Sequence, residues 1–381
     1  MDQRAIPAAF IRGGTSKGLF FHDRDLPDEA AARHAVFLAA IGSPDAYGRQ
    51  LDGMGGGISS LSKVMVVRPS AREDADVDYT FGQVAVAEEL VDERSNCGNL
   101  TSAIGPFAVD EGLVQVADGE ARLRLYNTNS DKIVVSRFAV ADGRAVVEGA
   151  VALPGVSGRG AAIRLDFLDP GGATTGRLLP TGNVVDRLSV PGLGEIEASL
   201  VDAATAAVFV AATDLGLQGT EMPEALEATP GLLDRLEAIR RAAAVAMGLP
   251  PISQSAPKIG FVATPAPAAT LAGEALPSDA MDVNARMISM GRPHRALPLT
   301  GALCLAAAAR LTGSTVWQAA GGAEEARALR IAQPSGIMGL EARVSNTEGW
   351  QVDSVTAIRT ARRLMEGRVL VPEARLASLA G

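Results

Sequence analysis

The residue best suited to proton chemistry in this chain is a cysteine in a tight turn. Cys97 is one of only two cysteines among 381 residues, and its neighbours Asn96, Gly98 and Asn99 accept unusual backbone angles. The small and apolar residues that follow predict a buried helix, kinked or short because it contains Pro106. A cysteine at a helix start faces unpaired N–H groups and the positive end of the helix dipole, which stabilise a thiolate. The alternative is a small buried apolar residue, the usual role of a free cysteine.

Lys63 is the second candidate, because it follows a polar, glycine-rich passage and precedes an apolar run, residues 64–67. A lysine that faces inward beside a cleft loses hydration, which lowers its pKa and lets the free amine act as a base. The competing interpretation is a surface lysine at a strand edge. The neighbouring glycines and serines offer N–H and O–H donors for carboxylates, or else form a flexible loop. They are Gly55, Gly56, Gly57, Ser59, Ser60 and Ser62.

Other groups that could carry chemistry are few. Arg12, Arg292, His294 and Arg295 can pair with acidic substrate groups, although most arginines are solvated surface residues. Cys304 lies in an alanine-rich run and is expected to pack rather than react. The three histidines lack the spacing of metal ligands, and no nucleotide-binding or serine-hydrolase motif is present. The sequence therefore favours a site without metal or nucleotide.

Composition limits the class of protein and its partners. At 381 residues, with 47 % hydrophobic and 21 % charged residues, the chain predicts a folded protein of two domains. The net charge of −9 without a long basic run argues against nucleic acid as the main partner. Neither a signal peptide nor an apolar run of the ~18 residues that a membrane span needs is visible. Two distant cysteines do not make a disulfide framework, so a soluble cytoplasmic protein is expected.

The elements expected to position these residues alternate between strands and helices in both halves of the chain. A weak internal repeat links residues 97–103 with 299–305, each a turn that leads into a helix of small residues. Two such helix starts that face one cleft would make an anion-binding site. Strands are expected near 6–21 (two strands around a glycine turn), 64–67, 78–86, 196–201, 206–210 and 258–262, and helices near 27–41, 223, 232–247 and 299–311.

Several longer passages together resemble the PrpF family of isomerases. They are IPAAFIRGGTSKGLFF (6–21), IGSPDAYGRQLDGMGGGISSLSKV (41–64), DVDYTFGQVAV (76–86), SNCGNLTSAIGPFAVDEGLV (95–114), FLDP (167–170), LPTGNVVD (179–186), PKIGFV (257–262) and PSG (334–336). Because they extend over nearly the whole chain, the resemblance is much more specific than any single motif.

The resemblance implies an α+β, diaminopimelate-epimerase-like fold. Two similar halves, residues 1–186 and 187–381, would each wrap a curled sheet around a central helix, with the active site in the cleft between them. Lys63 and Cys97 match the catalytic lysine and cysteine of the family. The residues expected to bind substrate are Arg12, Gly13, Gly14, Thr15, Ser16, Ser59, Ser60, Ser62, Asn96, Gly98, Asn99, Thr181, Met290, His294, Thr300, Gly301 and Ser335.

The implied activity is cofactor-independent proton transfer on a small unsaturated di- or tricarboxylate, by allylic deprotonation and reprotonation. Lys63 is the first choice as base, and Cys97 is either the partner acid or a group that orients the substrate. The main expectation is an activity like that of the 2-methylaconitate cis-trans isomerases. A 4-oxalomesaconate tautomerase or an aconitate or methylitaconate delta-isomerase is the alternative, because the residues after His294 differ from those of the methylaconitate isomerases. A non-catalytic carboxylate binder is the alternative from another class, and a homodimer is left open.

A racemase with two thiols is disfavoured. The epimerases of this fold use two cysteines at facing helix starts, whereas the second half here reads Leu299-Thr300-Gly301 at that position.

Overall fold

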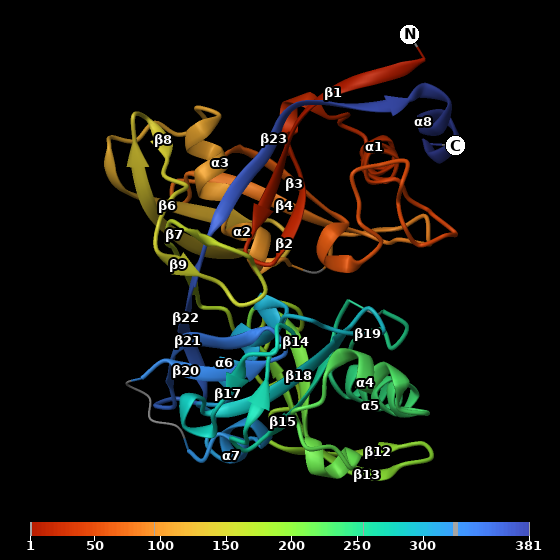
Figure 1. The fold of residues 1–381 in the computed structure, drawn as a ribbon, viewed down its shortest axis with the longest axis vertical. Coiled ribbons are helices and arrows are strands. Elements are labelled where there is room, and N and C mark those ends of the chain that lie inside the picture. The colour runs from red at the N-terminus through yellow and green to blue at the C-terminus, as the bar shows by residue number, and fades with distance from the viewer. Residues whose placement is uncertain (1, 95, 254, 323–326, 381) are drawn as a thin grey trace. The chain divides into compact units, whose positions relative to one another are not determined.

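The structure, a computed structural model, describes residues 2–94, 96–253, 255–322 and 327–380 and divides into two compact units. The first unit comprises residues 1–165 and 359–381, and the second comprises 166–358. Both units combine strands with a few helices, which confirms the α+β class expected from the sequence (Figure 1).

The first unit contains four helices and most of its strands precede residue 165. Its helices are α1 (Ala30–Ile41), α2 (Gly98–Thr101), α3 (Ile104–Asp110) and α8 (Glu373–Ala380) among the described residues. Its strands are β1 (Gln3–Gly13), β2 (Ser16–His22), β3 (Lys63–Pro69), β4 (Val77–Val84), β5 (Val91–Asp92), β6 (Gly119–Asn127), β7 (Lys132–Ala141), β8 (Arg144–Ala145), β9 (Val151–Ala152), β10 (Arg159–Gly160) and β23 (Ala361–Pro372), and β11 (Ile163–Leu168) crosses into the second unit.

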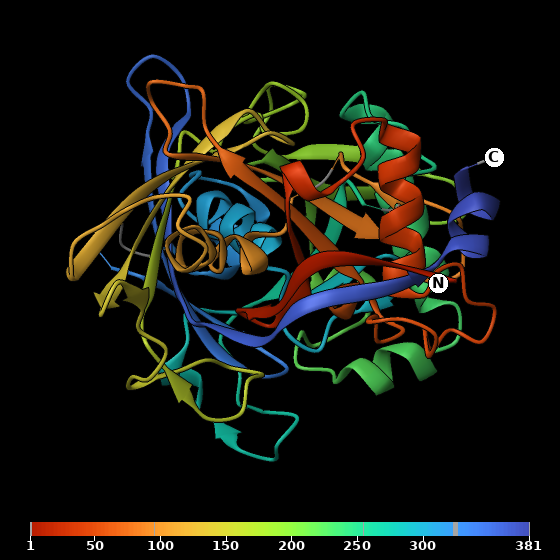
Figure 2. The same ribbon diagram turned by 90° about the horizontal axis from the view of Figure 1, so that it is seen from above.

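The C-terminal strand β23 pairs with the N-terminal strand β1 over its whole length, from Gln3↔Pro372 to Gly13↔Ala361. Figure 2 shows the two strands side by side, with α8 beside α1. The expected division after residue 186 therefore differs from the observed units, since 166–186 belong to the second and 359–381 to the first. Local sequence patterns carry no information on such a long-range pairing, so the C-terminal segment was assigned to the nearer half.

The centre of the first unit is a helix interrupted after one turn. All four residues of α2 are buried, and so are most of those of α3. Pro106 is the third residue of α3, within the first turn, where its missing N–H leaves no hydrogen bond unmade. The prediction of a short or kinked buried helix is thus confirmed.

The second unit likewise combines strands with a few helices. Its strands are β12 (Asp186–Val190), β13 (Gly194–Asp202), β14 (Ala206–Ala211), β15 (Lys258–Ala263), β16 (Ala268–Ala269), β17 (Ala275–Leu276), β18 (Val283–Ser289), β19 (Arg292–Pro293), β20 (Leu329–Gln333), β21 (Gly336–Ser345) and β22 (Gln351–Arg359), which returns the chain to the first unit. Its helices are α4 (Pro223–Ala228), α5 (Leu232–Ala246), α6 (Leu299–Ala308) and α7 (Thr315–Ala319) among the described residues.

The central helix of this unit is α6, whose ten residues are all buried. It packs against β13, β14 and β21 (Figure 1). Small and apolar side chains on every face suit a helix enclosed by a sheet, because no face needs to meet water. Each unit thus has a buried central helix.

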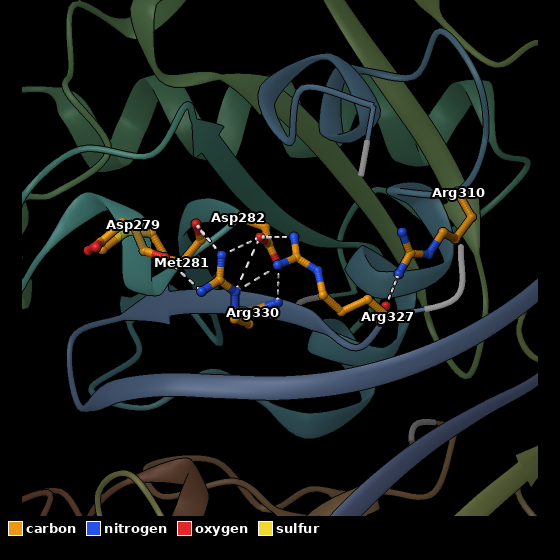
Figure 3. A network of polar contacts seen from close by, with 6 residues as sticks. All are labelled: Asp279, Met281, Asp282, Arg310, Arg327 and Arg330. Atoms are coloured by element: carbon orange, nitrogen blue, oxygen red, sulfur yellow. Dashed lines mark hydrogen bonds and ion pairs between the residues drawn. The ribbon is translucent and has the colours of Figure 1, made fainter. Parts of the chain in front are cut away.

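A polar cluster fixes the register of β20 beside β18. The carboxylate of Asp282 accepts hydrogen bonds from Arg327 Nη2 at 2.7 Å and from Arg330 Nη2 at 2.8 Å, and Arg330 N donates to its second oxygen at 2.8 Å. Figure 3 shows both guanidinium groups directed at this carboxylate. These contacts join residues within the second unit, which supports a structural role for the cluster.

Among the described residues, none of the helices is long and apolar enough to span a lipid bilayer.

Candidate active site

Lys63 is the first residue of β3, and its side chain is buried against β4. Its register partner across the two strands is Gln83, and Lys63 Nζ donates a hydrogen bond to Gln83 Oε1 at 2.6 Å. The nitrogen also lies 4.8 Å from the centre of the Phe81 ring. Burial lowers the pKa of Lys63 from its ordinary value of 10.5, although the nearby Cys97 acts in the opposite direction. The inward-facing lysine expected from the sequence is therefore the observed one, and the surface alternative is wrong.

Cys97 immediately precedes α2 and is buried. Its sulfur lies 3.9 Å from Ser16 Oγ and interacts with the Lys63 side chain. The Cys97 carbonyl accepts hydrogen bonds from the backbone N–H and the hydroxyl of Thr101, at 3.0 Å and 3.1 Å. The structure thus brings together the two groups that the sequence proposed as catalytic, from segments more than 30 residues apart.

The glycine turn between β1 and β2 packs directly on the start of α2. A Cβ placed on Gly13 would lie 2.6 Å from the carbonyl oxygen of Asn99, and Gly14 has a φ of +51°. Asn99 Nδ2 donates to Thr15 Oγ1 at 3.1 Å across the same contact. Only glycine permits this approach of two backbones, and the close approach brings Ser16 near Cys97.

Arg12 supports this turn from the side. Its guanidinium donates to the carbonyls of Gly14 and Thr360, at 3.0 Å and 2.9 Å, and to the Thr360 hydroxyl at 3.0 Å. Burial and the neighbouring Arg362 lower the pKa of Arg12. These contacts explain Arg12 as a brace for the turn, and its pairing with a substrate carboxylate stays a prediction.

The three serines before Lys63 occupy different environments. Ser62 is buried, and its hydroxyl contacts Gln50 Oε1 at 2.7 Å and the Ile58 carbonyl at 2.9 Å. Ser59 and Ser60 form part of a short 3-10 turn (59–61) and are half-buried. Ser62 therefore stabilises the loop, while the hydroxyls of the other two lie closer to solvent.

Sequence reasoning missed two polar residues on β4. Tyr79, Phe81 and Gln83 alternate along the strand, share one face and are all buried. The Tyr79 hydroxyl contacts Thr101 Oγ1 at 3.2 Å, and burial raises the pKa of this phenol. The sequence signal is that Tyr79 and Gln83 are four residues apart in a strand. They therefore share one face, whose other residues are apolar.

Asn96 was expected to bind substrate and is placed beside this group. Its side-chain oxygen is buried and has no hydrogen-bond partner among the described residues. A buried acceptor without a donor is uncommon, which marks this position as one where a ligand group can contribute a hydrogen bond. Ser95, which begins the quoted passage, lies outside the described residues.

The candidates of the second unit lie in the first turn of α6 and in separate loops. Thr300 and Gly301 lie in the first turn of α6 and are buried. Met290 adopts a φ of +53°, in a turn that leads to the half-buried His294. The hydroxyls of Ser335 and Thr181 form hydrogen bonds within the protein. Ser335 Oγ donates to the Arg295 carbonyl, and Thr181 Oγ1 donates to Asp186 at 2.8 Å. Their binding of substrate stays a prediction.

No cluster of histidine, cysteine or carboxylate side chains suited to hold a metal ion occurs in the described part of the chain. The second cysteine, Cys304, is fully buried inside α6, where its sulfur approaches the Val201 carbonyl at 3.3 Å. Burial raises its pKa far above the usual range. Cys304 is a packing residue, as the sequence predicted.

Comparison with known proteins defines the class of this protein. The family model described as "PrpF protein" matches residues 3–372. The chain therefore belongs to the PrpF family.

Three similar relatives have the same identity of 38 % and near-complete coverage. They are the 2-methyl-aconitate isomerase of Shewanella oneidensis (97 % of this chain and 98 % of the relative), the 3-methylitaconate isomerase of Eubacterium barkeri (98 % and 99 %) and the 4-oxalomesaconate tautomerase of Pseudomonas putida (97 % and 97 %). The family and the isomerase class expected from the sequence are confirmed.

Solved structures support the fold. A crystal structure of methylitaconate-delta-isomerase superposes with a TM-score of 0.81 at 38 % identity, over 99 % of this chain and 98 % of that one. A probable proline racemase from Agrobacterium radiobacter shares the fold at 13 % identity, with a TM-score of 0.57 over 95 % and 92 % of the two chains. The racemase- and epimerase-type fold expected from the sequence is confirmed.

Proposed function

We propose that this protein moves a proton within a small unsaturated di- or tricarboxylate, with Lys63 as the base. The observation that carries the proposal is the buried Lys63 amine, with its lowered pKa, beside Cys97. A base for carbon acids works best when its pKa lies near the working pH, and burial moves a lysine in that direction. The printed names of the relatives, which refer to methylaconitate, methylitaconate and oxalomesaconate, supply the substrate class.

The proposed reaction has two proton-transfer steps. The neutral Lys63 amine takes a proton from a carbon next to the C=C bond, and the electron pair of the broken C–H bond moves into a dienolate stabilised by the carboxylates. The Lys63 ammonium then returns the proton, either to the other allylic carbon or after rotation about a bond. The first outcome shifts the double bond, and the second interconverts cis and trans forms.

The dienolate is costly in water, so the protein has to stabilise its charge by several kcal/mol. The Lys63 ammonium formed in the first step is itself a counter-charge for it. Cys97 acts either as the partner acid or as a group that orients and polarises the substrate. The remaining residues proposed to contact substrate are Arg12, Gly13, Gly14, Thr15, Ser16, Ser59, Ser60, Ser62, Asn96, Gly98 and Asn99 in the first unit, and Thr181, Met290, His294, Thr300, Gly301 and Ser335 in the second.

A racemase reaction on an amino acid is disfavoured by the second unit. A two-thiol mechanism needs a second cysteine at a helix start, whereas Thr300 and Gly301 open α6 and Cys304 is enclosed within it. Turnover of a chiral amino acid would instead favour the racemase reaction.

The test is proton NMR of the protein in D2O with methylaconitate, aconitate, oxalomesaconate and methylitaconate. Deuterium entering one allylic position of one acid would establish the reaction and identify the substrate. No exchange with any acid, from folded protein, would contradict the proposal and favour a carboxylate binder.

A further inference from the structure

We propose that Gln83 is a positioning residue, which orients the Lys63 nitrogen for proton transfer and stabilises its protonated form. Gln83 lies on β4, is 6 % exposed, and is the register partner of Lys63 on β3. The inference deepens the proposed function and rests on it.

The orientation of the Gln83 amide is fixed by its other hydrogen bonds. Gln83 Nε2 donates to the carbonyls of Ser59 at 3.1 Å and Ser62 at 2.9 Å. Carbonyl oxygens only accept hydrogen bonds, so the amide NH₂ has to face them. The amide oxygen is therefore directed at Lys63, and its distance to Nζ is 2.6 Å.

This arrangement restricts the lysine nitrogen on two sides. One N–H is held by Gln83, and the nitrogen lies 4.8 Å from the centre of the buried Phe81 ring. Rotation about the Cε–Nζ bond is thereby limited, which leaves the nitrogen lone pair in a defined direction for proton uptake.

Gln83 also affects the two protonation states of Lys63 unequally. A hydrogen bond from an ammonium to a carbonyl oxygen is about twice as strong as one from a neutral amine, and burial strengthens it further. Gln83 thus favours the protonated form and offsets part of the effect of burial. Removing its oxygen is expected to lower the basicity of Lys63, which a purely structural residue would leave unchanged.

Gln50 provides a matched control in the same unit. It is 1 % exposed, and its amide oxygen accepts hydrogen bonds from Gly57 N at 2.8 Å and Ser62 Oγ at 2.7 Å. Its amide nitrogen donates to Ser43 Oγ at 2.8 Å. Gln50 therefore braces the same serine- and glycine-rich loop through an amide of equal size, and none of these contacts involves Lys63.

The experiment is an NMR titration of the lysine side chains in the full-length protein labelled with 13C and 15N at lysine. The chain contains only four lysines, and the Lys63 signal is assigned by its loss in Lys63→Met. In Gln83→Met the Lys63 midpoint is expected to fall by about one pH unit or more, as loss of a hydrogen bond to a charged group implies. In Gln50→Met it is expected to stay in place.

A second variant tests the opposite direction. Gln83→Glu places a carboxylate beside the amine and is expected to raise the Lys63 midpoint. A midpoint that is the same in the wild type, Gln83→Met and Gln83→Glu overturns the proposal, and so does an equal shift in Gln50→Met.

Activity separates this inference from the proposed function. With the exchanging acid, kcat/KM of Gln83→Met at neutral pH is expected to fall about ten- to a hundredfold, and the rising limb of its pH profile should move with the NMR midpoint. A shifted midpoint in a protein that exchanges no acid would confirm the coupling of Gln83 to Lys63 and contradict the proposed function.

Discussion

Each unit begins a buried strand with a lysine, and the two lysines differ in what contacts their nitrogen. Lys63 opens β3 and Lys258 opens β15, with 8 % and 6 % exposure. Lys63 Nζ meets the side chains of Gln83 and Cys97. Lys258 Nζ donates to the backbone carbonyl of Ser255 at 3.0 Å. The same position in the strand thus provides a lysine that donates to the Gln83 side chain in one unit and a lysine that donates to a main-chain carbonyl, and acts electrostatically on Cys304, in the other.

The central helices show a matching difference. Cys97 directly precedes α2, whereas Pro298 precedes α6 and Cys304 is its sixth residue. The weak repeat between residues 97–103 and 299–305 therefore corresponds to similar scaffolds with different chemistry. Proton transfer on this scaffold is expected to use one base, which removes and returns the proton, rather than two thiols acting from opposite sides.

The largest expected effect separates the two lysines. Lys63→Met removes the proposed base and is expected to lower the deuterium-exchange rate by a factor of about 10²–10⁴. Lys258→Met is expected to lose less activity than Lys63→Met, because the proposed base is Lys63 and the Lys258 nitrogen donates to the Ser255 carbonyl. Exchange rates from NMR in D2O, with circular dichroism as a control for folding, make the comparison. Equal losses in both variants would mean that the asymmetry between the units is functionally irrelevant.

The two glycine contacts are expected to differ in stability. Alanine at Gly13 would place a Cβ 2.6 Å from the Asn99 carbonyl oxygen and 2.9 Å from the Leu100 Cα, backbone atoms that cannot move separately. We expect a loss of about 3 kcal/mol. At Gly301 the nearest atoms are the end of the flexible Met287 side chain, and alanine is the better helix former by about 1 kcal/mol, so the net change should be small. Unfolding in urea measures both, and a greater loss for Gly301→Ala would contradict this reasoning.

Substitution of Cys97 should change the activity, whereas substitution of Cys304 should change the stability. Cys97→Ser is expected to lower the activity by about tenfold, far less than Lys63→Met, because Lys63 performs the proton transfer. Cys304→Ser replaces a thiol enclosed in α6 and is expected to cost about 1 kcal/mol of stability with no change in exchange rate. If Cys97→Ser is as inactive as Lys63→Met, Cys97 is itself an acid or base in the reaction.

The smallest expected effect is the pH dependence of stability. Burial lowers the pKa of Lys63 in the folded protein, whereas the unfolded chain titrates near 10.5. Between these values the unfolded chain binds more protons at Lys63, so the free energy of unfolding rises with pH, by at most about 1.4 kcal/mol per unit. The unfolding free energy of the wild type minus that of Lys63→Met should therefore become more positive as the pH approaches 10.5. If this signed difference stays flat or becomes more negative, the pKa of Lys63 is not lowered.

Local sequence patterns predict both the class of protein and the two residues proposed as catalytic. A lysine between a serine-rich loop and an apolar run, and a cysteine between asparagines and glycine, are local patterns. The family motifs extend over both units, so the fold and the isomerase class followed from them. The interrupted helix was also predictable, because proline restricts its own backbone whatever surrounds it.

The polar groups that contact Lys63 and Cys97 depend on long-range packing, which the sequence pattern does not show. Gln83 reaches Lys63 because the two are opposite each other in the register of β3 and β4, and register depends on the whole sheet. The same holds for Arg12, which contacts Thr360 at the far end of the chain. Ser62 was expected to bind substrate, yet its hydroxyl is directed at Gln50. Hydrogen bonds between residues distant in sequence arise from packing, and local sequence patterns do not encode them.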